Sequence, residues 1–306
     1  MVKKRVESPA RADLFVREMF PGCGRRELVR VFQAGGVRVN GRVASKGQRL
    51  VAGDEIEVTE APHPVTDRAP LAQAELPLSV LYEDDSLLAV NKLPGQPTHP
   101  LVAAELGTLA NAVVARYPEC LRASPDVREA GAAHRLDAWT SGVLVFAREP
   151  GAWRSLRDQF GAGRVQKDYL ALVAGFVAEV IEITAPLARR KTRVIAGGGS
   201  VDSLPAHTVV TCVERYPHEG LSLVTCTCTT GRMHQVRAHL AYAGLPVIGD
   251  PTYGIAAAPA LCAPPGYFLH ARRIAFRHPV TGAPVEVQAP LPSERAQLLE
   301  RLAVAR

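Results

Sequence analysis

A proline-rich segment near residue 70 limits what this chain can fold into, because it separates a short amino-terminal part from a much longer remainder. Prolines fall there among Ala, Gln and Thr residues, at Pro62, Pro64, Pro70 and Pro77. Proline is disfavoured inside helices and central strands. We therefore predict a linker at residues 61–76 between two structured parts, residues 1–60 and 77–306. A chain of 306 residues can form one larger domain and one smaller one.

Two helices are predicted in residues 1–60. Ser8 is typical of a helix cap and Pro9 of a first helical position, so we expect the first helix to begin there. The second helix is predicted from about Arg25, with apolar residues at helical spacing, to the pair Gly35-Gly36.

A β-hairpin is predicted after the second helix. Residues 37–43 alternate apolar and polar side chains around Asn40-Gly41, which is the strongest short signal for a hairpin. A further turn at Gly53-Asp54 precedes an alternating segment that contains Ile56 and Val58. The first part of the chain is thus expected to combine two helices with short strands.

Positive charge is concentrated in this first part. The whole chain carries a formal net charge of +6, which fits a polyanionic partner, although charge alone does not define a fold. Before position 50 there are twelve Lys and Arg residues against four Asp and Glu residues. Such a focused cluster is what phosphate neutralisation requires. The alternative is a solvated helix face. The candidate contacts to a polyanion in this cluster are Arg25, Arg26, Arg38 and Lys46.

Several classes of protein are not favoured by the sequence. The basic start of the chain has no apolar stretch behind it, so we do not expect a secretory signal, and no apolar run approaches the ~18 residues of a membrane span. The six cysteines include no C-x-x-C pair, and Cys226 and Cys228 are expected in the core beside Val224. His234 and His239 are five positions apart, without the H-E-x-x-H pattern of a zinc protease. We expect a reduced, cytoplasmic protein without a metal.

The larger part is predicted to be an α+β domain with a mixed, mainly antiparallel sheet. Predicted strands outnumber helices and follow no steady βαβ rhythm, which disfavours a doubly wound fold. A closing helix is expected at residues 294–303. The clearest predicted strands are residues 143–146, 169–173, 207–213 and 221–229.

Two segments place charged residues at turns beside apolar runs. They are residues 134–142 (HRLDAWTSG) and residues 230–237 (TGRMHQVR). Asp137 precedes a buried-looking strand, and a carboxylate at the edge of a core is costly unless it is paired. Taken alone, an acid in such a turn is more often a structural cap.

These two segments, together with residues 167–175 (KDYLALVAG), resemble the catalytic signature of the RluA-type RNA pseudouridine synthases. Residues 1–60 are similar to the alpha-L RNA-binding module named for a small-subunit ribosomal protein. The resemblance implies a synthase fold with a central cleft, and it covers most of the chain. Departures from the family pattern are residues 91–95 (NKLPG), where proline usually follows the lysine, and the pair Ala138-Trp139.

The resemblance also implies roles for individual residues. Asp137 would be the catalytic carboxylate, and Arg237 the guanidinium that favours its ionised form. Tyr169 would pack against the target base, although a tyrosine in a strand is often plain core. Arg135 would take the place of the flipped nucleotide, or would form a structural salt bridge. Further candidate RNA contacts are Arg232 and His234.

Isomerisation of uridine oxidises nothing and takes nothing from solvent, so we expect neither a cofactor nor a metal. The expected partner is RNA, with large-subunit ribosomal RNA favoured over transfer RNA by analogy, and the protein is expected to be a monomer without membrane contact. The alternatives are a transfer RNA pseudouridine synthase, a non-catalytic RNA-binding or ribosome-assembly factor, and a nucleoside glycosidase. The basic segment 189–193 would follow the RNA backbone or form a solvated loop.

Overall fold

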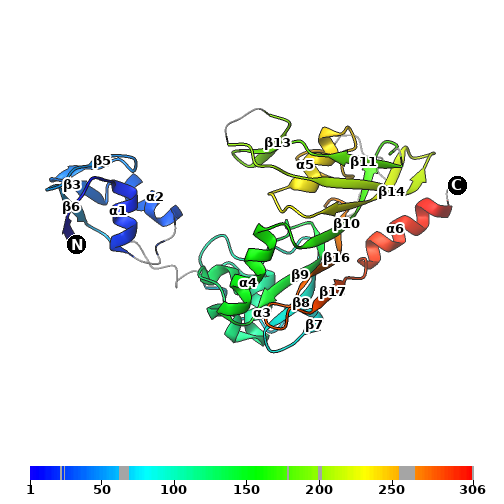
Figure 1. Cartoon of the computed structure of the whole chain (residues 1–306), viewed down its shortest axis with the longest axis horizontal. Helices are drawn as coiled ribbons and strands as arrows, with labels where there is room; N and C mark the ends of the chain where they lie inside the picture. The colour runs from blue at the N-terminus through cyan, green and yellow to red at the C-terminus, as the bar shows by residue number, and fades with distance from the viewer. Residues whose placement is uncertain are drawn as a thin grey trace. The chain divides into compact units, whose positions relative to one another are not determined.

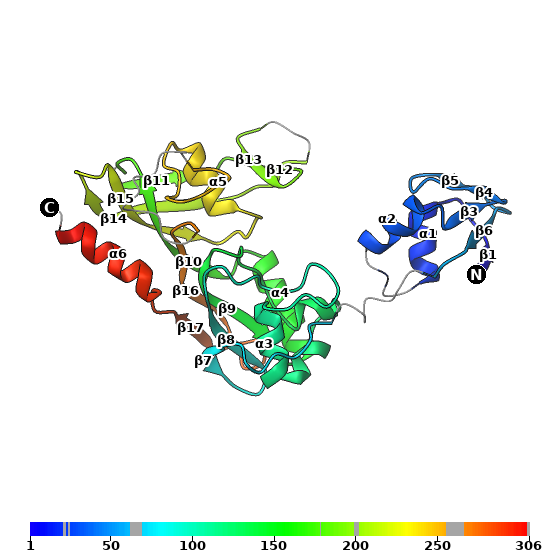
Figure 2. The same cartoon turned by 180° about the vertical axis from the view of Figure 1, so that it is seen from behind.

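A computed structural model of the chain describes residues 1–20, 23, 25–61, 69–177, 179–198, 202–254 and 266–304. It divides into an amino-terminal unit that includes Met1–Ala69 and a large unit that includes Glu129–Arg306 (Figures 1 and 2). Each unit has its own hydrophobic core. Most of the predicted linker, residues 62–68, lies outside the described residues. Within the described part of the chain, no helix is long and apolar enough to cross a membrane.

The amino-terminal unit packs two helices against short strands. Its sheet has the strand order β1-β6-β3-β4, and β2 pairs with β5. Val16 and Val31 from the helices and Ile56 from the sheet belong to one buried cluster. Its elements are β1 (Val2–Arg5), β2 (Ala10–Arg11), α1 (Ala12–Met19), α2 (Arg25–Gln33), β3 (Val37–Val39), β4 (Arg42–Val43), β5 (Arg49–Leu50) and β6 (Glu55–Val58).

The predicted hairpin is confirmed. β3 and β4 pair antiparallel, and both turn residues adopt the left-handed conformation, with φ of 51° at Asn40 and 80° at Gly41. The side chain of Asn40 also donates to Asp54 Oδ1 at 2.8 Å and accepts from the amide of Glu55 at 2.9 Å. The two turns predicted from the sequence therefore support each other.

The predicted start of the first helix at Pro9 is wrong. The helix begins at Ala12, because β2 immediately before it pairs with β5. The amide of Ala12 then donates to the carbonyl of Gln48 at 2.9 Å. The pairing of β2 with β5 thus overrides the preference of Ser8 and Pro9 for a helix start. β1, which the sequence analysis did not predict, pairs with β6 and places Lys3 and Lys4 on an edge strand.

The large unit is built on a nine-stranded sheet with the order β11-β14-β15-β10-β16-β9-β8-β7, and β17 pairs with β16. Its pairs are antiparallel except for β9 and β16, so the predicted mixed, mainly antiparallel α+β fold is confirmed. Its strands are β7 (Ser79–Glu83), β8 (Leu87–Lys92), β9 (Ser141–Ala147), β10 (Gln166–Ala174), β11 (Val180–Ile183), β14 (Thr208–Tyr216), β15 (Leu221–Cys228), β16 (Leu269–Arg277) and β17 (Pro284–Gln288). A separate two-stranded sheet is formed by β12 (Leu187–Arg190) and β13 (Arg193–Ala196).

Helices cover both faces of this sheet. Ala171 and Val173 of β10 pack with α5, whereas Leu170 and Leu172 on the opposite face of the same strand pack with α6. In the other half of the sheet, α3 and α4 likewise cover opposite faces of β9. The helices are α3 (Leu109–Arg116), η2 (Pro118–Arg122), η3 (Val127–Glu129), α4 (Pro150–Gly161), α5 (Gln235–Tyr242) and α6 (Ser293–Val304).

The predicted strands and the closing helix overlap observed elements, with ends that differ by no more than three residues. Cys226 and Cys228 are buried in one cluster with Val224, as predicted. The segment 189–193 was expected as a loop, but it forms part of a two-stranded hairpin in which Arg190 pairs with Arg193.

Candidate active site

Asp137 lies in a tight turn directly before β9. The amide of Thr140 donates to the carbonyl of Asp137 at 3.0 Å, and the chain then enters β9, all of whose residues are buried. Gly142 has a φ of 111°, and a β-carbon there would lie 2.1 Å from the carbonyl oxygen of Ala271. A glycine is therefore required where β9 approaches β16, and this close approach fixes where the turn lies.

Arg237 reaches Asp137 from α5. Its side chain is buried, and Nη1 donates to Asp137 Oδ2 at 2.8 Å, whereas the carboxylate of Asp137 stays 20% exposed. The structure thus brings together the two residues that the resemblance paired across a hundred positions of sequence. A charge-assisted hydrogen bond of this length holds the carboxylate in one orientation.

A second carboxylate, Asp250, fixes Arg237 from the other side. Its oxygens accept from Nε at 2.7 Å and from Nη2 at 2.8 Å, and Oδ1 also accepts from the amides of Thr252 and Tyr253. Burial opposes both charges, but these hydrogen bonds outweigh it, lowering the pKa of Asp250 and raising the pKa of Arg237. Asp250 is therefore an ionised structural partner and not a proton donor.

Tyr267 completes the surroundings of Asp137. Its hydroxyl donates to Asp137 Oδ2 at 3.4 Å, and its ring centroid lies 4.3 Å from the guanidinium carbon of Arg237. Burial raises the pKa of Tyr267, so this hydroxyl stays protonated and can donate. The carboxylate thus has an anchored cation and a neutral hydroxyl on one oxygen.

The pocket around this carboxylate has polar and apolar walls. Tyr169, from β10, contributes a half-buried ring, and burial raises the pKa of its hydroxyl. A flat base can pack against such a surface. The lining residues are Arg135, Leu136, Asp137, Thr140, Tyr169, Cys228, Thr230, Gly231, Arg232, His234, Gln235, Val236, Arg237 and Leu269.

His234 lies beside the carboxylate at the start of α5. It adopts the left-handed conformation with a φ of 53°, which places Nε2 3.8 Å from Asp137 Oδ1. Its Nδ1 lies 3.0 Å from the hydroxyl of Tyr253. Burial lowers the pKa of His234, so the ring is neutral at neutral pH.

Two further predicted RNA contacts stand at the rim of the pocket. Arg135 is exposed, and within the part of the chain that the structure describes it makes no ion pair. The salt-bridge alternative for this residue is therefore not supported. Arg232 is also exposed and donates through Nε to the carbonyl of Pro205 at 3.0 Å, which leaves the rest of its guanidinium accessible.

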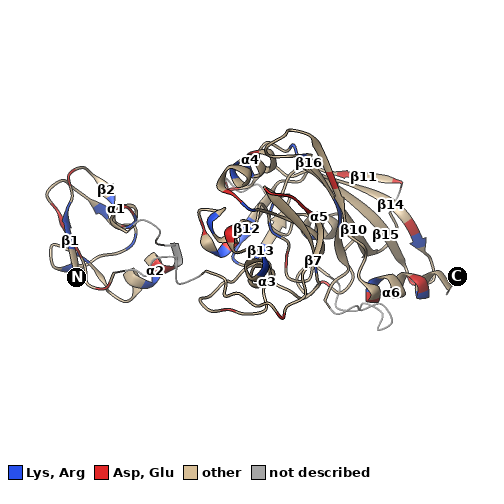
Figure 3. Cartoon of the chain, turned by 90° about the horizontal axis from the view of Figure 1, so that it is seen from below, with Lys and Arg blue, Asp and Glu red and all other residues tan. Residues whose placement is uncertain are grey.

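The remaining predicted contacts lie in the amino-terminal unit. Arg38 is exposed on β3 and donates to the carbonyl of Gly41 at 3.1 Å, and Lys46 is half-buried. The side chains of Arg25 and Arg26 lie outside the described residues. Figure 3 marks the Lys and Arg positions in blue along the ribbon, including those of β1.

Sequence reasoning missed four residues that shape the site: Asp250, Tyr267, Lys92 and Arg295. Lys92 is fully buried, and Nζ donates to the carbonyls of residues 93, 96 and 138 at 2.7 to 2.9 Å. Burial lowers the pKa of Lys92 to about 7. For Asp250 the sequence offers only a carboxylate in a turn at 249–254, and for Lys92 only a lysine at the end of an apolar strand. Neither signal indicates which residue the side chain would contact.

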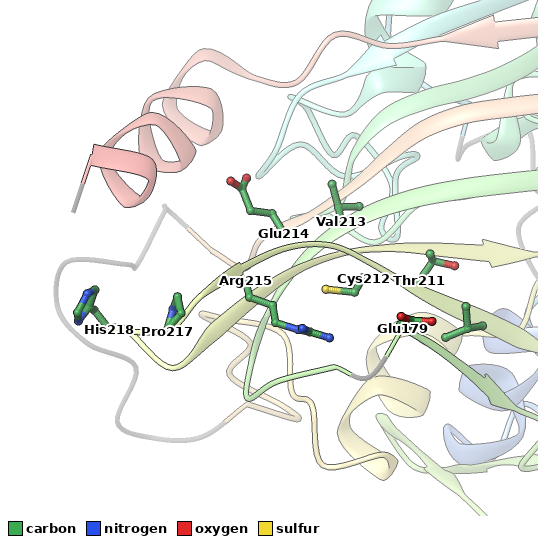
Figure 4. A pocket seen from close by; sticks show the side chains of 9 residues that line it. Glu179, Thr211, Cys212, Val213, Glu214, Arg215, Pro217 and His218 are labelled. Carbon is green, nitrogen blue, oxygen red and sulfur yellow. The ribbon is translucent and has the colours of Figure 1, made fainter. Parts of the chain in front are cut away.

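A wider groove lies elsewhere in the large unit. It has a volume of about 810 Å³ and is lined by residues from β11, β14 and the turn after β14 (Figure 4). Arg215 in its wall donates to the carbonyl of Val177, and none of its lining residues belongs to the motifs. Converging charged groups, and not volume, therefore single out the pocket around Asp137 as the candidate active site. Within the described ranges, no group of three or more His, Cys, Asp or Glu residues could hold a metal ion.

The sequence matches a known family and known relatives. The profile of a family described as RNA pseudouridylate synthase matches residues 86–242. Ribosomal large subunit pseudouridine synthase D of Xanthomonas campestris is 35% identical, over 95% of this chain and 88% of that protein. Ribosomal large subunit pseudouridine synthase C of Escherichia coli K12 is 34% identical, over 98% of this chain and 95% of that protein.

Solved structures agree with these matches. Human RNA pseudouridylate synthase domain containing 1 superimposes with a TM-score of 0.57 and 28% sequence identity. The superposition covers 74% of this chain and 95% of the human one. The likeness thus extends from sequence motifs to the fold.

Proposed function

Because this chain belongs to the RluA-type family of RNA pseudouridylate synthases, it is an RNA pseudouridine synthase, and we propose that it acts on large-subunit ribosomal RNA with Asp137 as the catalytic carboxylate. The choice of RNA follows the names of the relatives with which it aligns over almost its full length. About a third of the residues are identical to those of these relatives, which supports a shared chemistry. The choice of the individual uridine would depend on surface residues that are particular to this chain.

The reaction needs few protein groups. The bond between the base nitrogen N1 and the sugar carbon C1′ breaks, the uracil turns, and C5 bonds to C1′. The proton on C5 leaves and N1 gains a proton, so the product is an isomer of the substrate. A carboxylate beside the sugar can act as nucleophile or base in these steps. Asp137 is the partly exposed acid of the pocket, and it is the group that meets this need.

The observation that carries the proposal is the chain of contacts Asp137–Arg237–Asp250. One fixed guanidinium bonds both carboxylates at 2.7 to 2.8 Å, and only the carboxylate of Asp137 is open to the pocket. Arg237 and Asp250 together hold the carboxylate of Asp137 in one orientation, because each hydrogen bond connects groups that are themselves fixed. It also disfavours a glycosidase, since Asp250 is held ionised and cannot supply the proton that glycoside hydrolysis generally requires.

The pocket walls supply the remaining functions in this proposal. The ring of Tyr169 holds the detached uracil by stacking, at roughly 1–3 kcal/mol per base. Arg135, exposed and without an ion pair in the described part of the chain, enters the stack left by the flipped uridine, because a planar guanidinium can replace a base. Arg232 and His234 contact the neighbouring backbone.

The amino-terminal unit acts in this scheme as an RNA-binding module, joined through a linker at residues 61–76. Its basic residues on β1, together with Arg25, Arg26, Arg38 and Lys46, would neutralise phosphates and raise affinity without reading sequence. The synthase domain begins at about residue 77.

Mapping pseudouridine in total RNA from cells with and without this gene tests the proposal. We expect one or a few pseudouridines to disappear from large-subunit ribosomal RNA and to return with the wild-type gene. Loss from transfer RNA alone would overturn the choice of substrate. With purified enzyme and a uridine-containing fragment, release of free uracil would favour a glycosidase, and binding without product would favour a non-catalytic factor.

A further inference from the structure

Arg295 is a buried cation outside the three segments that resemble the family signature. It lies in the first turn of α6, near the carboxyl end of the chain, and only 1% of its surface is exposed. It is one of the largest fully buried side chains of the described residues. Such a side chain cannot touch RNA, so its function must act through its protein neighbours.

Its guanidinium joins two segments of the active site. Nη2 donates to the carbonyl of Trp139 at 2.8 Å, in the turn that carries Asp137, and Nη1 donates to the hydroxyl of Ser141 at 2.7 Å, at the first residue of β9. The same nitrogens donate to the carbonyls of Tyr267 and Leu269, at 2.8 and 2.7 Å. Four hydrogen bonds thus fasten the Asp137 turn to the residues that open β16.

All four acceptors are neutral oxygens. Within the described ranges, Arg295 forms no ion pair with a carboxylate, and burial lowers its pKa to about 10. Placing an unpaired charge in a protein interior is unfavourable unless every donor is well bonded. If α6 only had to pack against the sheet, an apolar residue could occupy this position. The presence of Arg295 therefore indicates that its hydrogen bonds are needed.

The hydrogen bonds continue past Ser141. Its hydroxyl accepts from Arg295 and lies 2.9 Å from Nδ1 of His270, whose Nε2 lies 3.2 Å from the carbonyl of Ala289. Lys92 donates to the carbonyl of Ala138, the residue before Trp139. Two buried basic side chains, Lys92 and Arg295, therefore bind successive carbonyls of the turn and restrict its backbone.

This fastening bears on the reacting groups. The Asp137 turn and the start of β16 carry the two side chains whose oxygens lie 3.4 Å apart, Asp137 Oδ2 and the hydroxyl of Tyr267. Arg237 contacts both, by a hydrogen bond and through the ring of Tyr267. A shift of one segment against the other would change all of these distances together, and a displacement of about 1 Å can cost about 100-fold in rate.

We propose that Arg295 is a positioning residue for the isomerisation, whose guanidinium sets the Asp137 turn against the start of β16 and so fixes the catalytic carboxylate. The proposal rests on the assignment of Asp137 as that carboxylate. It concerns the chemical step, because a side chain that is 1% exposed does not contact a bound RNA directly.

The decisive variant is Arg295→Met, which keeps an unbranched apolar stem and removes every donor. We expect kcat to fall about 10- to 100-fold, with KM for the RNA within about threefold of wild type, because the loss affects the chemistry and not RNA binding. Arg295→Lys keeps the charge but cannot reach four acceptors, and should retain more kcat than Arg295→Met.

Leu298→Ala is the matched control. Leu298 lies one turn further along α6, is 2% exposed, and packs with Phe268 without bonding the turn. It should lower the free energy of unfolding by about 2–5 kcal/mol while leaving kcat per folded molecule within about twofold. Equal kcat losses in Arg295→Met and Leu298→Ala would overturn the positioning role.

Chemical rescue separates position from general stability. Guanidinium ion at low millimolar concentration should raise kcat of Arg295→Ala several-fold and leave Leu298→Ala and wild type unchanged. Absence of rescue would count against the proposal.

If both Arg295→Met and Arg295→Ala are insoluble, Ser141→Ala takes their place, because it removes one of the four acceptors of Arg295. An unchanged kcat in Ser141→Ala would overturn the proposal. Turnover by Asp137→Asn would instead overturn the assignment of Asp137, so the two failures are distinguishable.

Discussion

Asp250 holds Arg237 by two hydrogen bonds, of 2.7 Å at Nε and 2.8 Å at Nη2, which leaves Nη1 of the same guanidinium for Asp137. A planar guanidinium fixed along one edge can present its remaining nitrogen in only one direction. The orientation of the candidate catalytic carboxylate is therefore decided by a residue that does not face the substrate.

Asp250→Asn should impair the chemical step. The amide offers a single acceptor oxygen and turns an N–H group towards a guanidinium, so Arg237 loses one bond and its fixed orientation. We expect kcat to fall about 10- to 100-fold with KM within about threefold, measured by tritium release from RNA labelled at C5 of uridine. Asp158→Asn, at an exposed position of α4, is the control, and equal kcat in the two variants would contradict the structural role.

Asp137→Asn should abolish isomerisation while RNA binding stays largely intact. The amide retains the size of the side chain but has no negative charge to act as nucleophile or base. We expect single-turnover product formation to fall by at least about 10³-fold, and the dissociation constant for RNA to change little. Wild-type turnover in this variant would show that another group performs the chemistry.

Substitutions of Tyr169 distinguish stacking from proton transfer. If the ring holds the base, Tyr169→Phe should keep kcat within about tenfold, whereas Tyr169→Leu should lose about 1–3 kcal/mol more in kcat/KM. Both variants are measured at several pH values with the same RNA fragment. A larger loss in the phenylalanine variant than in the leucine variant would assign the function to the hydroxyl.

Basic residues of the amino-terminal unit should control affinity through salt-dependent contacts. The double variant of Arg38→Gln and Lys46→Gln is expected to weaken RNA binding and to lower the slope of log K against log salt by about 1 for each lost contact. Arg30→Gln is the control in the same unit, because Arg30 is already bonded to Glu27 and Glu60. An unchanged slope in the double variant would place the RNA elsewhere.

The free energy of unfolding should fall as the solution is acidified. Burial lowers the pKa of His270 to about 4, below its ordinary value of 6.5. Between these values the unfolded chain binds a proton that the folded chain does not, so stability rises with pH there, by up to about 1.4 kcal/mol per pH unit. Urea unfolding at pH 4.5 to 7 measures the slope, which His270→Asn should reduce and the exposed-site control His218→Gln should not.

Local sequence signals were sufficient for several elements. Asn40-Gly41 predicted its hairpin because few residues other than Asn and Gly adopt the left-handed conformation at two successive positions. The Asp137 motif was found because its turn, its glycine and its apolar strand are contiguous in sequence. The identity of Arg237 as partner came from a family resemblance and not from spacing.

Nonlocal contacts account for what could not be predicted. Arg295 and Trp139 are 156 positions apart, and Tyr267 and Asp137 are 130 positions apart, so no periodicity or cap signal relates them. The first helix shows the same limit, since pairing of β2 with β5 displaced a start that Ser8 and Pro9 favoured. Contacts between distant segments determine where such elements begin and which side chains meet. The residues near each position contain no signal for these contacts.

The parallel pairing of β16 with β9 has a consequence for synthesis of the protein. β16 lies between β10 and β9, so a nascent chain that has not yet emerged past residue 277 lacks the strand that joins the two halves of the sheet. Because α6 follows later still, the turn of Asp137 gains its hydrogen bonds to Arg295 only after residue 295 has been made. The two halves of the sheet are therefore made before the strand that joins them, and the site around Asp137 can form only after all three.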